Sequence, residues 1–338
     1  MDYPKKPNIH HMHRGDLSLS VMDWGATMLN LSIRVPSENT QRRLLLGLKT
    51  TDEYKDQDLF LNATIGRYAN RIKGSSFSLG GHEYFLSSGA EHCLHGGIEG
   101  FHLRRFDFID QTDSSCTLKM VSPDLDQGFP GNFTLIVNFA LHPDSTLEIR
   151  YYAQCDRECY ASITNHAYFN LNGHNSTILN HGLQLDSDAF LELDHASIPT
   201  GRIISMDNCR AFDFRKMKKI GLDFLNDEQM IPSKGYDHPF LIKGEKDKPF
   251  ATVLSEDEKV QMQVFTDYPC TQFYSGNYIH ATRDILAWDD GKPYANQSAF
   301  CLEPGFCPDG PHLKEPKTDP VGPGKPLDKS IAYKFTAR

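Results

Sequence analysis

The most informative carboxylate of the chain lies near its C-terminus, in the stretch Phe300-Cys-Leu-Glu303-Pro304-Gly-Phe-Cys. Proline restricts the residue before it to extended conformations, so we expect Glu303 to be held rigidly at the end of a strand. The apolar residues before Glu303 predict that the carboxylate is partly removed from water. Because desolvation raises the pKa of a carboxyl group toward neutral pH, this setting suits a general base.

Three other short stretches place a titratable side chain beside glycine, proline or aromatic residues. His95 lies in Leu-His-Gly-Gly, His166 in Asn-His-Ala-Tyr-Phe-Asn, and Asp237 in Tyr-Asp-His-Pro. In an extended segment His166, Tyr168 and Asn170 would share one face, a set that suits hydrogen bonding and stacking against a sugar ring. Each stretch also has a simpler interpretation, namely a turn for His95 and Asp237 and a polar outer face for His166.

Two further stretches could contact a ligand that carries many hydroxyl groups. Arg71 follows Asn70 in Gly-Arg-Tyr-Ala-Asn-Arg-Ile, where its guanidinium could offer a forked donor. Gln272 and Tyr278 begin and end the stretch Gln-Phe-Tyr-Ser-Gly-Asn-Tyr, which offers an amide and aromatic rings. The alternatives are a plain surface arginine in the first stretch and core packing in the second.

Metal and nucleotide chemistry have weaker support. The histidines of His10-His-Met-His13 resemble a metal-binding tract, but we expect residues 1–14 to be a mobile N-terminal segment. Cys155 and Cys159 have a loose metal spacing without a second Cys/His pair nearby. The sequence also lacks Gly-x-Ser-x-Gly, a Walker loop and a dinucleotide fingerprint. We therefore expect neither a metal nor a cofactor.

Charge and composition exclude several classes of partner. The net charge is -9 and the pI is near 5.9, and the sequence has no basic stripe, so we do not expect nucleic-acid binding. No apolar stretch approaches the ~20 residues of a membrane helix, and the N-terminus shows no signal-peptide pattern, so we expect no membrane partner. The eight cysteines are scattered, mostly among apolar neighbours. Paired disulfides are the alternative, but we interpret the cysteines as buried free thiols of a cytoplasmic protein.

Short strand-like runs dominate the chain. Phe133–Leu141 and Leu147–Gln154 alternate in polarity around the turn His142-Pro-Asp-Ser, so they predict a hairpin. Similar runs occur at Ser18–Met22, Thr27–Val35, Phe77–Leu79, Cys116–Val121, Gly182–Leu185, Ile203–Met206, Lys259–Thr266 and Ile331–Phe335. A short helical turn is predicted at Lys216–Leu225. Because no low-complexity linker divides the chain, we expect residues 1–338 to form a single all-β domain, either a sandwich or a barrel.

The order and wording of these motifs together resemble the aldose 1-epimerase (galactose mutarotase) family. The resemblance runs nearly end to end, from Asp23-Trp-Gly-Ala-Thr to Leu302-Glu-Pro. The long match at Asn165-His-Ala-Tyr-Phe-Asn-Leu is the most diagnostic part of it. The resemblance implies a large antiparallel β-sandwich with a shallow sugar cleft and no cofactor.

The resemblance also implies roles for individual residues. His166 matches the general acid of the family, Glu303 matches the general base, and His95 matches the second active-site histidine. The positions that match sugar contacts are Asn70, Arg71, Tyr168, Asp237 and Gln272, and Tyr278 falls where the family often places an aromatic residue.

Three departures from the family pattern concern substrate preference more than chemistry. Gly305 stands where the family usually has Gln or a similar polar residue. Glu91-His-Cys93 replaces a stretch that commonly carries Asn, and His102 and Phe106 lie in a motif that often contains Asp and Trp. The acid and base positions are retained, so we expect the same chemistry.

We therefore predict an isomerase that interconverts the α and β anomers of free aldoses such as D-galactose or D-glucose. Ring opening needs a base at O1 and an acid at the ring oxygen O5, which requires Glu303 to be ionised and His166 protonated in the resting enzyme. The alternatives are a non-catalytic sugar-binding or sensor protein on the same fold and a related sugar-phosphate epimerase. We expect a monomer or a weak homodimer whose ligand is a monosaccharide.

Overall fold

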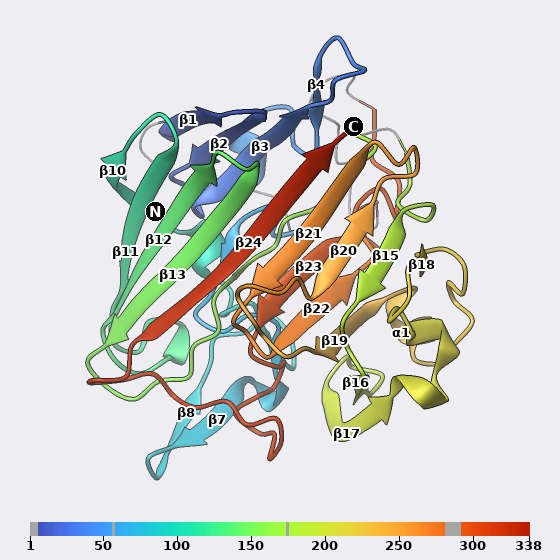
Figure 1. The fold of residues 1–338 in the computed structure, drawn as a ribbon. Coiled ribbons are helices and arrows are strands. Elements are labelled where there is room, and N and C mark those ends of the chain that lie inside the picture. The colour runs from blue at the N-terminus through green and yellow to red at the C-terminus, as the bar shows by residue number, and fades with distance from the viewer. Residues whose placement is uncertain (1–5, 56–57, 174–175, 281–291) are drawn as a thin grey trace.

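The fold is built almost entirely from strands, as the computed structural model of residues 6–55, 58–173, 176–280 and 292–338 shows (Figure 1). Within these ranges the α-helix is α1 (Met230–Ser233). Short 3-10 turns are η1 (Asp52–Lys55), η2 (Lys73–Ser75), η3 (Phe101–Leu103), η4 (Asp126–Gly128), η5 (Met206–Asn208) and η6 (Arg210–Phe212). No helix in the described ranges is long and apolar enough to cross a membrane.

The largest sheet has nine strands in the order β10-β11-β12-β13-β24-β21-β20-β15-β18. Two of its inner strands, β12 (Phe133–His142) and β13 (Thr146–Cys155), form the antiparallel hairpin that the alternating sequence predicts. Along β12 each buried residue is followed by a half-buried one, as expected for a strand with one face on the core. The other strands are β10 (Asp107–Gln111), β11 (Ser115–Ser122), β15 (Gly182–Leu185), β18 (Lys218–Lys219), β20 (Ala251–Leu254), β21 (Val260–Thr266) and β24 (Leu327–Ala337).

A five-stranded antiparallel sheet lies against the first one and carries much of the candidate site. Its strands, in spatial order, are β17 (Pro199–Ser205), β16 (Ala189–Leu193), β19 (Asp237–Leu241), β22 (Cys270–Tyr274) and β23 (Cys301–Gly305). Figure 1 shows β22 and β23 behind β20 and β21. Val264 of β21, Phe273 of β22 and Leu302 of β23 belong to one buried apolar cluster, so the two sheets share a hydrophobic core. The expected all-β sandwich architecture is therefore confirmed.

Smaller sheets complete the fold. A four-stranded sheet contains β1 (Ile9–Arg14), β2 (Leu17–Met22), β3 (Thr27–Arg34) and β4 (Gln41–Arg43). Three two-stranded sheets pair β5 (Thr64–Ile65) with β14 (Thr164–Asn165), β6 (Arg71–Ile72) with β9 (Cys93–Leu94), and β7 (Ser76–Leu79) with β8 (His82–Phe85). The first two of these pairs matter most here, because they position the candidate catalytic histidines.

Two local expectations differ from the structure. We expected residues 1–14 to be mobile, but residues 9–14 form β1, and the first five lie outside the described residues. The ring nitrogens of His11 and His13 lie 2.8 Å and 3.1 Å from serine hydroxyls of β2, so these histidines connect the strands. The helical turn predicted at Lys216–Leu225 is instead β18 followed by hydrogen-bonded turns.

The predicted strands and the free cysteines agree with the structure. Each remaining strand-like run overlaps a strand. All eight cysteines are buried free thiols.

Candidate active site

Short strands and a glycine turn position the two candidate catalytic histidines. His95 directly follows β9 and His166 directly follows β14, so each stands where a two-residue pairing ends. His95 has a φ of 52°, in the left-handed region. A Cβ atom on the next residue, Gly96, would lie 1.9 Å from the carbonyl oxygen of Gly66. The Gly-Gly pair after His95 therefore permits a close backbone approach that no larger residue allows.

Glu303 lies at the centre of β23 beside both histidines. Its Oε1 atom is 3.6 Å from Nε2 of His166. The ring centroids of His166 and His95 are 5.3 Å apart, and one nitrogen or oxygen atom of each of the three side chains lies within 4.8 Å of the others. His95, His166 and Glu303 are 5%, 5% and 6% exposed. The structure thus brings the three predicted catalytic residues into one buried cluster, which we call the catalytic cluster.

The position of His166 is fixed by its backbone and by contacts to one face and one edge of its ring. Its N–H donates to the carbonyl of Ala63, and its carbonyl accepts from the N–H of Asn62, both at 3.0 Å. Tyr168 stacks on the ring at 5.0 Å between centroids, with 16° between the planes. The Sγ atom of Cys301 lies 3.4 Å from Nδ1. These contacts leave Nε2 as the nitrogen that faces Glu303.

His95 is held as a neutral donor. The backbone N–H of Asn70 donates to its Nδ1 atom at 3.2 Å. Burial, followed by the charges of His166 and Arg71, holds the pKa of His95 well below its ordinary 6.5, so the ring is uncharged. With Nδ1 occupied as an acceptor, the remaining ring proton sits on Nε2.

The hydrogen bond from the Asn70 backbone to Nδ1 of His95 also bears on metal binding. His95, His166 and Glu303 are close enough together to hold a metal ion. A metal ligand must offer a free nitrogen lone pair, and in His95 the Nδ1 lone pair accepts from Asn70 while Nε2 carries a proton. The donor set therefore fits a hydrogen-bonding role for His95 better than metal ligation.

Burial sets the protonation of the His166–Glu303 pair. It lowers the pKa of His166 from 6.5 to about 3, against the opposing effect of that residue's own carbonyl group. Burial and the charge of Asp237 raise the pKa of Glu303 well above 4.5, an effect that Arg71 partly offsets. Burial therefore favours neutral His166 beside protonated Glu303, the reverse of the protonation expected from the sequence. Both arrangements hold one proton, and they differ in which group carries it.

A polar wall continues from Glu303 along the neighbouring strands. Gln272 on β22 is the register partner of Glu303, and its Nε2 atom donates to Oδ1 of Asp237 at 2.7 Å. Burial raises the pKa of Asp237, while Arg71 and the Gln272 bond lower it. The Oε1 atom of Gln272 is buried without a hydrogen-bond partner among the described residues. A buried acceptor without a partner indicates room for a hydroxyl donor of a ligand.

The other three predicted sugar contacts already make hydrogen bonds within the protein. Asn70, with a φ of 64°, accepts at Oδ1 from the next backbone N–H at 2.8 Å. The hydroxyl of Tyr168 donates to the carbonyl of Leu59 at 2.9 Å, and that of Tyr278 donates to the carbonyl of Pro232 at 3.2 Å. These residues therefore position the loops and rings around the catalytic cluster.

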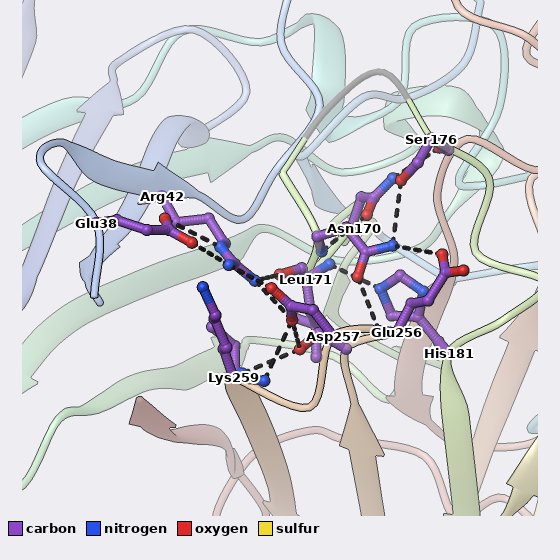
Figure 2. Close-up of polar contacts among 12 residues, drawn as sticks. Glu38, Arg42, Asn170, Leu171, Ser176, His181, Glu256, Asp257 and Lys259 are labelled. Atoms are coloured by element: carbon purple, nitrogen blue, oxygen red, sulfur yellow. Dashed lines mark hydrogen bonds and ion pairs between the residues drawn. The ribbon is translucent and has the colours of Figure 1, made fainter. Parts of the chain in front are cut away.

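Two residues of the predicted motifs lie outside the cluster. His238 is fully buried, accepts at Nδ1 from the N–H of Asp237 at 3.0 Å, and packs edge-on against Phe212. Asn170 donates to the carbonyl of Ser298 at 2.8 Å and belongs to the polar contacts shown in Figure 2. His238 is therefore a buried residue of β19 rather than part of a turn, and Asn170 does not share a ligand-facing surface with His166.

Three side chains beside the catalytic cluster were not predicted as site residues: Phe60 and Cys301 were missed, and His102 was noted only as a departure from the family pattern. The ring of Phe60 lies 4.4 Å from that of His95 and 4.5 Å from that of His102. His102, noted only as a departure, is buried, which lowers its pKa to about 4. Cys301 contacts His166, and the sequence could have indicated this. Cys301 lies two residues before Glu303, and side chains two residues apart on a strand share a face. Phe60 had no such signal in the sequence, since it lies in a loop at a φ of 57°.

Comparison with known protein sequences finds one family along most of the chain. The sequence profile of the aldose 1-epimerase family matches residues 8–334. The chain is 41% identical over 325 residues to aldose 1-epimerase of Escherichia coli (strain K12), covering 94% of this chain and 92% of that protein. It is 33% identical over 329 residues to galactose mutarotase of Bos taurus, covering 95% and 91%.

Solved structures show the same architecture. A GalM/aldose epimerase homologue from C. elegans superposes with a TM-score of 0.89 at 26% identity, covering 98% of this chain and 99% of that one. Galactose 1-epimerase from Lactobacillus acidophilus NCFM gives a TM-score of 0.82 at 24% identity, with 99% of both chains covered. The second likeness is one of fold alone.

Proposed function

Because this chain belongs to the aldose 1-epimerase family, we propose that its His166–Glu303 pair moves the protons that interconvert the α and β anomers of a free aldose. The chain is an isomerase of the aldose 1-epimerase type. The observation that carries the assignment of the pair is the 3.6 Å separation of Nε2 and Oε1 between two buried side chains. One acid and one base are sufficient for this reaction, because it only moves protons on oxygen and breaks and remakes one C–O bond.

Ring opening requires loss of the O1 proton and protonation of O5. Ionised Glu303 takes the proton from O1 while protonated His166 gives its Nε2 proton to O5. The C1–O5 bond breaks, and C1 becomes an aldehyde carbon. After rotation about C1–C2, attack of O5 on the other aldehyde face reverses both proton transfers and forms the other anomer.

The protonation that burial favours matches the middle of this cycle. Once the ring is open, Glu303 is protonated and His166 is neutral, which is the arrangement that burial favours. When a closed sugar binds, the shared proton must sit on His166 instead. The positive charge of Arg71 lowers the pKa of Glu303 and so favours that transfer. The pair carries one proton in both forms, so its titration belongs to the pair as a unit.

The neighbouring polar groups orient the sugar and stabilise developing charge. Neutral His95 offers an N–H donor to the oxygen that becomes negative as the ring opens. The unpaired Oε1 atom of Gln272 accepts from a sugar hydroxyl, and Asp237 and Arg71 hold further hydroxyls. None of these four groups needs to exchange a proton with the substrate.

We further propose that the substrate is D-galactose or D-glucose and that the enzyme acts without a metal or cofactor. The relatives named galactose mutarotase support a hexose of this class. The eight free thiols support a reducing compartment, the cytoplasm.

Polarimetry tests the proposed activity directly. Freshly dissolved α-D-glucose and α-D-galactose should approach their equilibrium rotations at a rate that rises in proportion to enzyme concentration, after subtraction of the rate in buffer alone. The same assay in EDTA should give the same rate. Sugar binding in calorimetry without any acceleration would instead support a binding protein, and activity lost in EDTA and restored by a divalent ion would contradict the metal-free proposal.

A further inference from the structure

One strand supplies a neighbour to each ring nitrogen of His166. Cys301 and Glu303 are two residues apart on β23, so their side chains project from the same face of the strand. The Sγ atom of Cys301 is 3.4 Å from Nδ1 of His166, and Oε1 of Glu303 is 3.6 Å from Nε2. The imidazole therefore lies across β23 with one nitrogen at each of these two side chains. Glu303 has a proposed role in proton transfer, whereas Cys301 has none so far.

The Cys301 thiol is a neutral partner for Nδ1. Cys301 is fully buried, and burial together with the charges of Glu303 and Asp237 raises the pKa of its thiol well above the ordinary 9.0. The sulfur therefore keeps its proton and cannot form an ion pair with the imidazolium. A thiol is both a weak donor and a weak acceptor, so it can bond to Nδ1 whether or not that nitrogen carries a proton.

We propose that Cys301 is a positioning residue that holds Nδ1 of His166, so that Nε2 alone exchanges a proton with the sugar. This inference rests on the proposed function, because it assumes that His166 is the acid that serves O5. The sulfur accepts a hydrogen bond from Nδ1–H, and no bond to sulfur forms or breaks during the reaction.

The proton balance shows why one tautomer is needed. Protonated His166 carries N–H groups at both nitrogens, and it loses the Nε2 proton to O5 when the ring opens. The neutral imidazole must then keep its proton on Nδ1, because ring closure returns the proton from O5 to an empty Nε2 lone pair. If the proton moved to Nε2 during the lifetime of the open chain, His166 could no longer act as the base. Cys301 can accept from Nδ1–H in both steps, and protonated Glu303, which faces Nε2, can donate to that nitrogen, so the two side chains of β23 together favour the required tautomer.

A neutral sulfur also suits the acid strength that the reaction needs. A carboxylate beside Nδ1 would stabilise the imidazolium and make His166 a weaker acid toward O5. The thiol holds the ring with little such stabilisation. In a Ser-His-Asp triad, by contrast, a carboxylate orients the imidazole and stabilises the imidazolium that forms.

Three substitutions at this position separate hydrogen bonding from packing. Cys301→Ser keeps a group that can accept from Nδ1–H, whereas Cys301→Ala removes it and Cys301→Val replaces it by an apolar side chain that fills the space. Cys116→Ala is the matched control, because Cys116 is a fully buried free thiol on β11, in the other sheet. Thermal unfolding of each variant establishes that it is folded under the assay conditions.

We expect Cys301→Ala and Cys301→Val to lower kcat by roughly three- to tenfold with KM unchanged, the effect of one lost hydrogen bond in the transition state. Cys301→Ser should stay within about threefold of the parent, and Cys116→Ala should match it. In nitrogen-15 NMR of histidine-labelled protein, His166 of the parent and the Ser variant should carry its neutral-form proton on Nδ1. In the Ala and Val variants part of this signal should shift to the Nε2–H form.

Two results would overturn the inference. One is a kcat for both Cys301→Ala and Cys301→Val within twofold of the parent in folded protein. The other is an equal loss in the Ser and Ala variants with no change of tautomer, which would show that packing alone matters. Assaying Glu303→Gln in parallel separates this inference from the proposed function. If Glu303→Gln is inactive while the Cys301 variants are fully active, only the role of Cys301 fails, and if Glu303→Gln is fully active, the proposed pair itself fails.

Discussion

The segment from Asn165 to Leu171 enters a different polar environment at each end. At its start, His166 lies in the catalytic cluster with His95 and Glu303. At its end, Leu171 lies in a second cluster with Glu38, Arg42, His181 and Asp257, which we call the Arg42 cluster (Figure 2). Both clusters bury a histidine and place it near charged side chains.

The Arg42 cluster pairs its charges closely. Arg42 donates to the carbonyl of Leu171 at 3.0 Å and to both carboxylate oxygens of Asp257 at 3.1 Å and 2.7 Å, and it also pairs with Glu38. The bond from Arg42 holds the pKa of the Asp257 carboxyl well below its usual range. His181 accepts from the N–H of Leu171 at 3.0 Å, and burial lowers its pKa to about 3.

The catalytic cluster leaves comparable groups without close partners. The 3.6 Å between His166 and Glu303 is longer than a normal hydrogen bond, and the Oε1 atom of Gln272 has no partner among the described residues. The same burial that keeps His181 neutral keeps His166 neutral. The Arg42 cluster also contains one buried atom without a partner among the described residues, Nδ1 of His181. The two clusters therefore differ mainly in their charges: those of the Arg42 cluster are paired, whereas Glu303 and the Oε1 atom of Gln272 remain available to a ligand.

The largest expected effect is that of Glu303→Gln on catalysis. The amide keeps the size of the side chain but cannot accept the O1 proton, so kcat should fall by ~10²–10⁴-fold, about 3–5 kcal/mol of barrier. Stability should change little, because burial already favours the uncharged form of Glu303. Glu256→Gln, a conservative change at the exposed edge of the Arg42 cluster, is the control. Polarimetry on folded Glu303→Gln that shows activity within a few-fold of the parent would disprove the assignment.

The complementary change, Arg42→Met, should mainly affect stability. It leaves the carboxylate of Asp257 without its partner, but that side chain is 39% exposed and can regain water. We therefore expect a loss of about 2–3 kcal/mol in the free energy of unfolding, with kcat nearly unchanged. Urea unfolding measures the loss, and Arg210→Met, at a side chain that is 87% exposed, is the control. A fall in kcat without a loss of stability would contradict the division between the two clusters.

Calorimetry of the same proteins tests the domain organisation. We propose that residues 1–338 form a single domain, because the two large sheets share one core. The parent and Arg42→Met should each unfold in one transition, with the variant at lower temperature. Two separated transitions would contradict the single domain.

Smaller effects are expected at the polar wall of the catalytic cluster. Asp237→Asn and Arg71→Ala each remove a charged partner of a sugar hydroxyl, which typically costs about 1.5–3 kcal/mol, or roughly 10- to 150-fold. If the contact is equally strong in the ground and transition states, the loss appears in KM rather than kcat. Asp319→Asn, at a side chain that is 84% exposed, should leave both unchanged. A collapsed kcat at constant KM would mean that the residue acts in proton transfer.

The sequence predicted the regular part of the fold better than the details of the site. The hairpin of β12 and β13 was visible because each of its strands has one face on the core, and this produces a two-residue period. β1 was missed because its three histidines read as a polar tract, although two of them bond to hydroxyls of the next strand. Glu303 and His166 were found through their motifs, but their protonation depends on burial that only the folded chain creates.

The last expected effect is the contribution of each buried histidine to the change of unfolding free energy with pH. This contribution should have the same sign in the catalytic cluster and in the Arg42 cluster. Burial lowers the pKa of His166, His181 and His238 from 6.5 to about 3. Between these values the unfolded chain binds a proton at each histidine and the folded chain does not, so stability rises with pH and is lost as the pH falls. Each histidine contributes at most about 1.4 kcal/mol per pH unit.

Raised pKa values oppose this trend at Glu303 and Asp237, where burial favours the protonated form and stability is lost as the pH rises. The slope of the unfolding free energy against pH therefore contains both positive and negative contributions. The difference in slope between a variant and the parent isolates the contribution of one group. His181→Asn should reduce the slope of unfolding free energy between pH 5 and 6.5 by about one proton. His166→Asn should reduce it by less, because removing His166 also changes the titration of Glu303. Urea unfolding at several pH values measures both slopes, and an unchanged slope in His181→Asn would show that this histidine is not held neutral by burial.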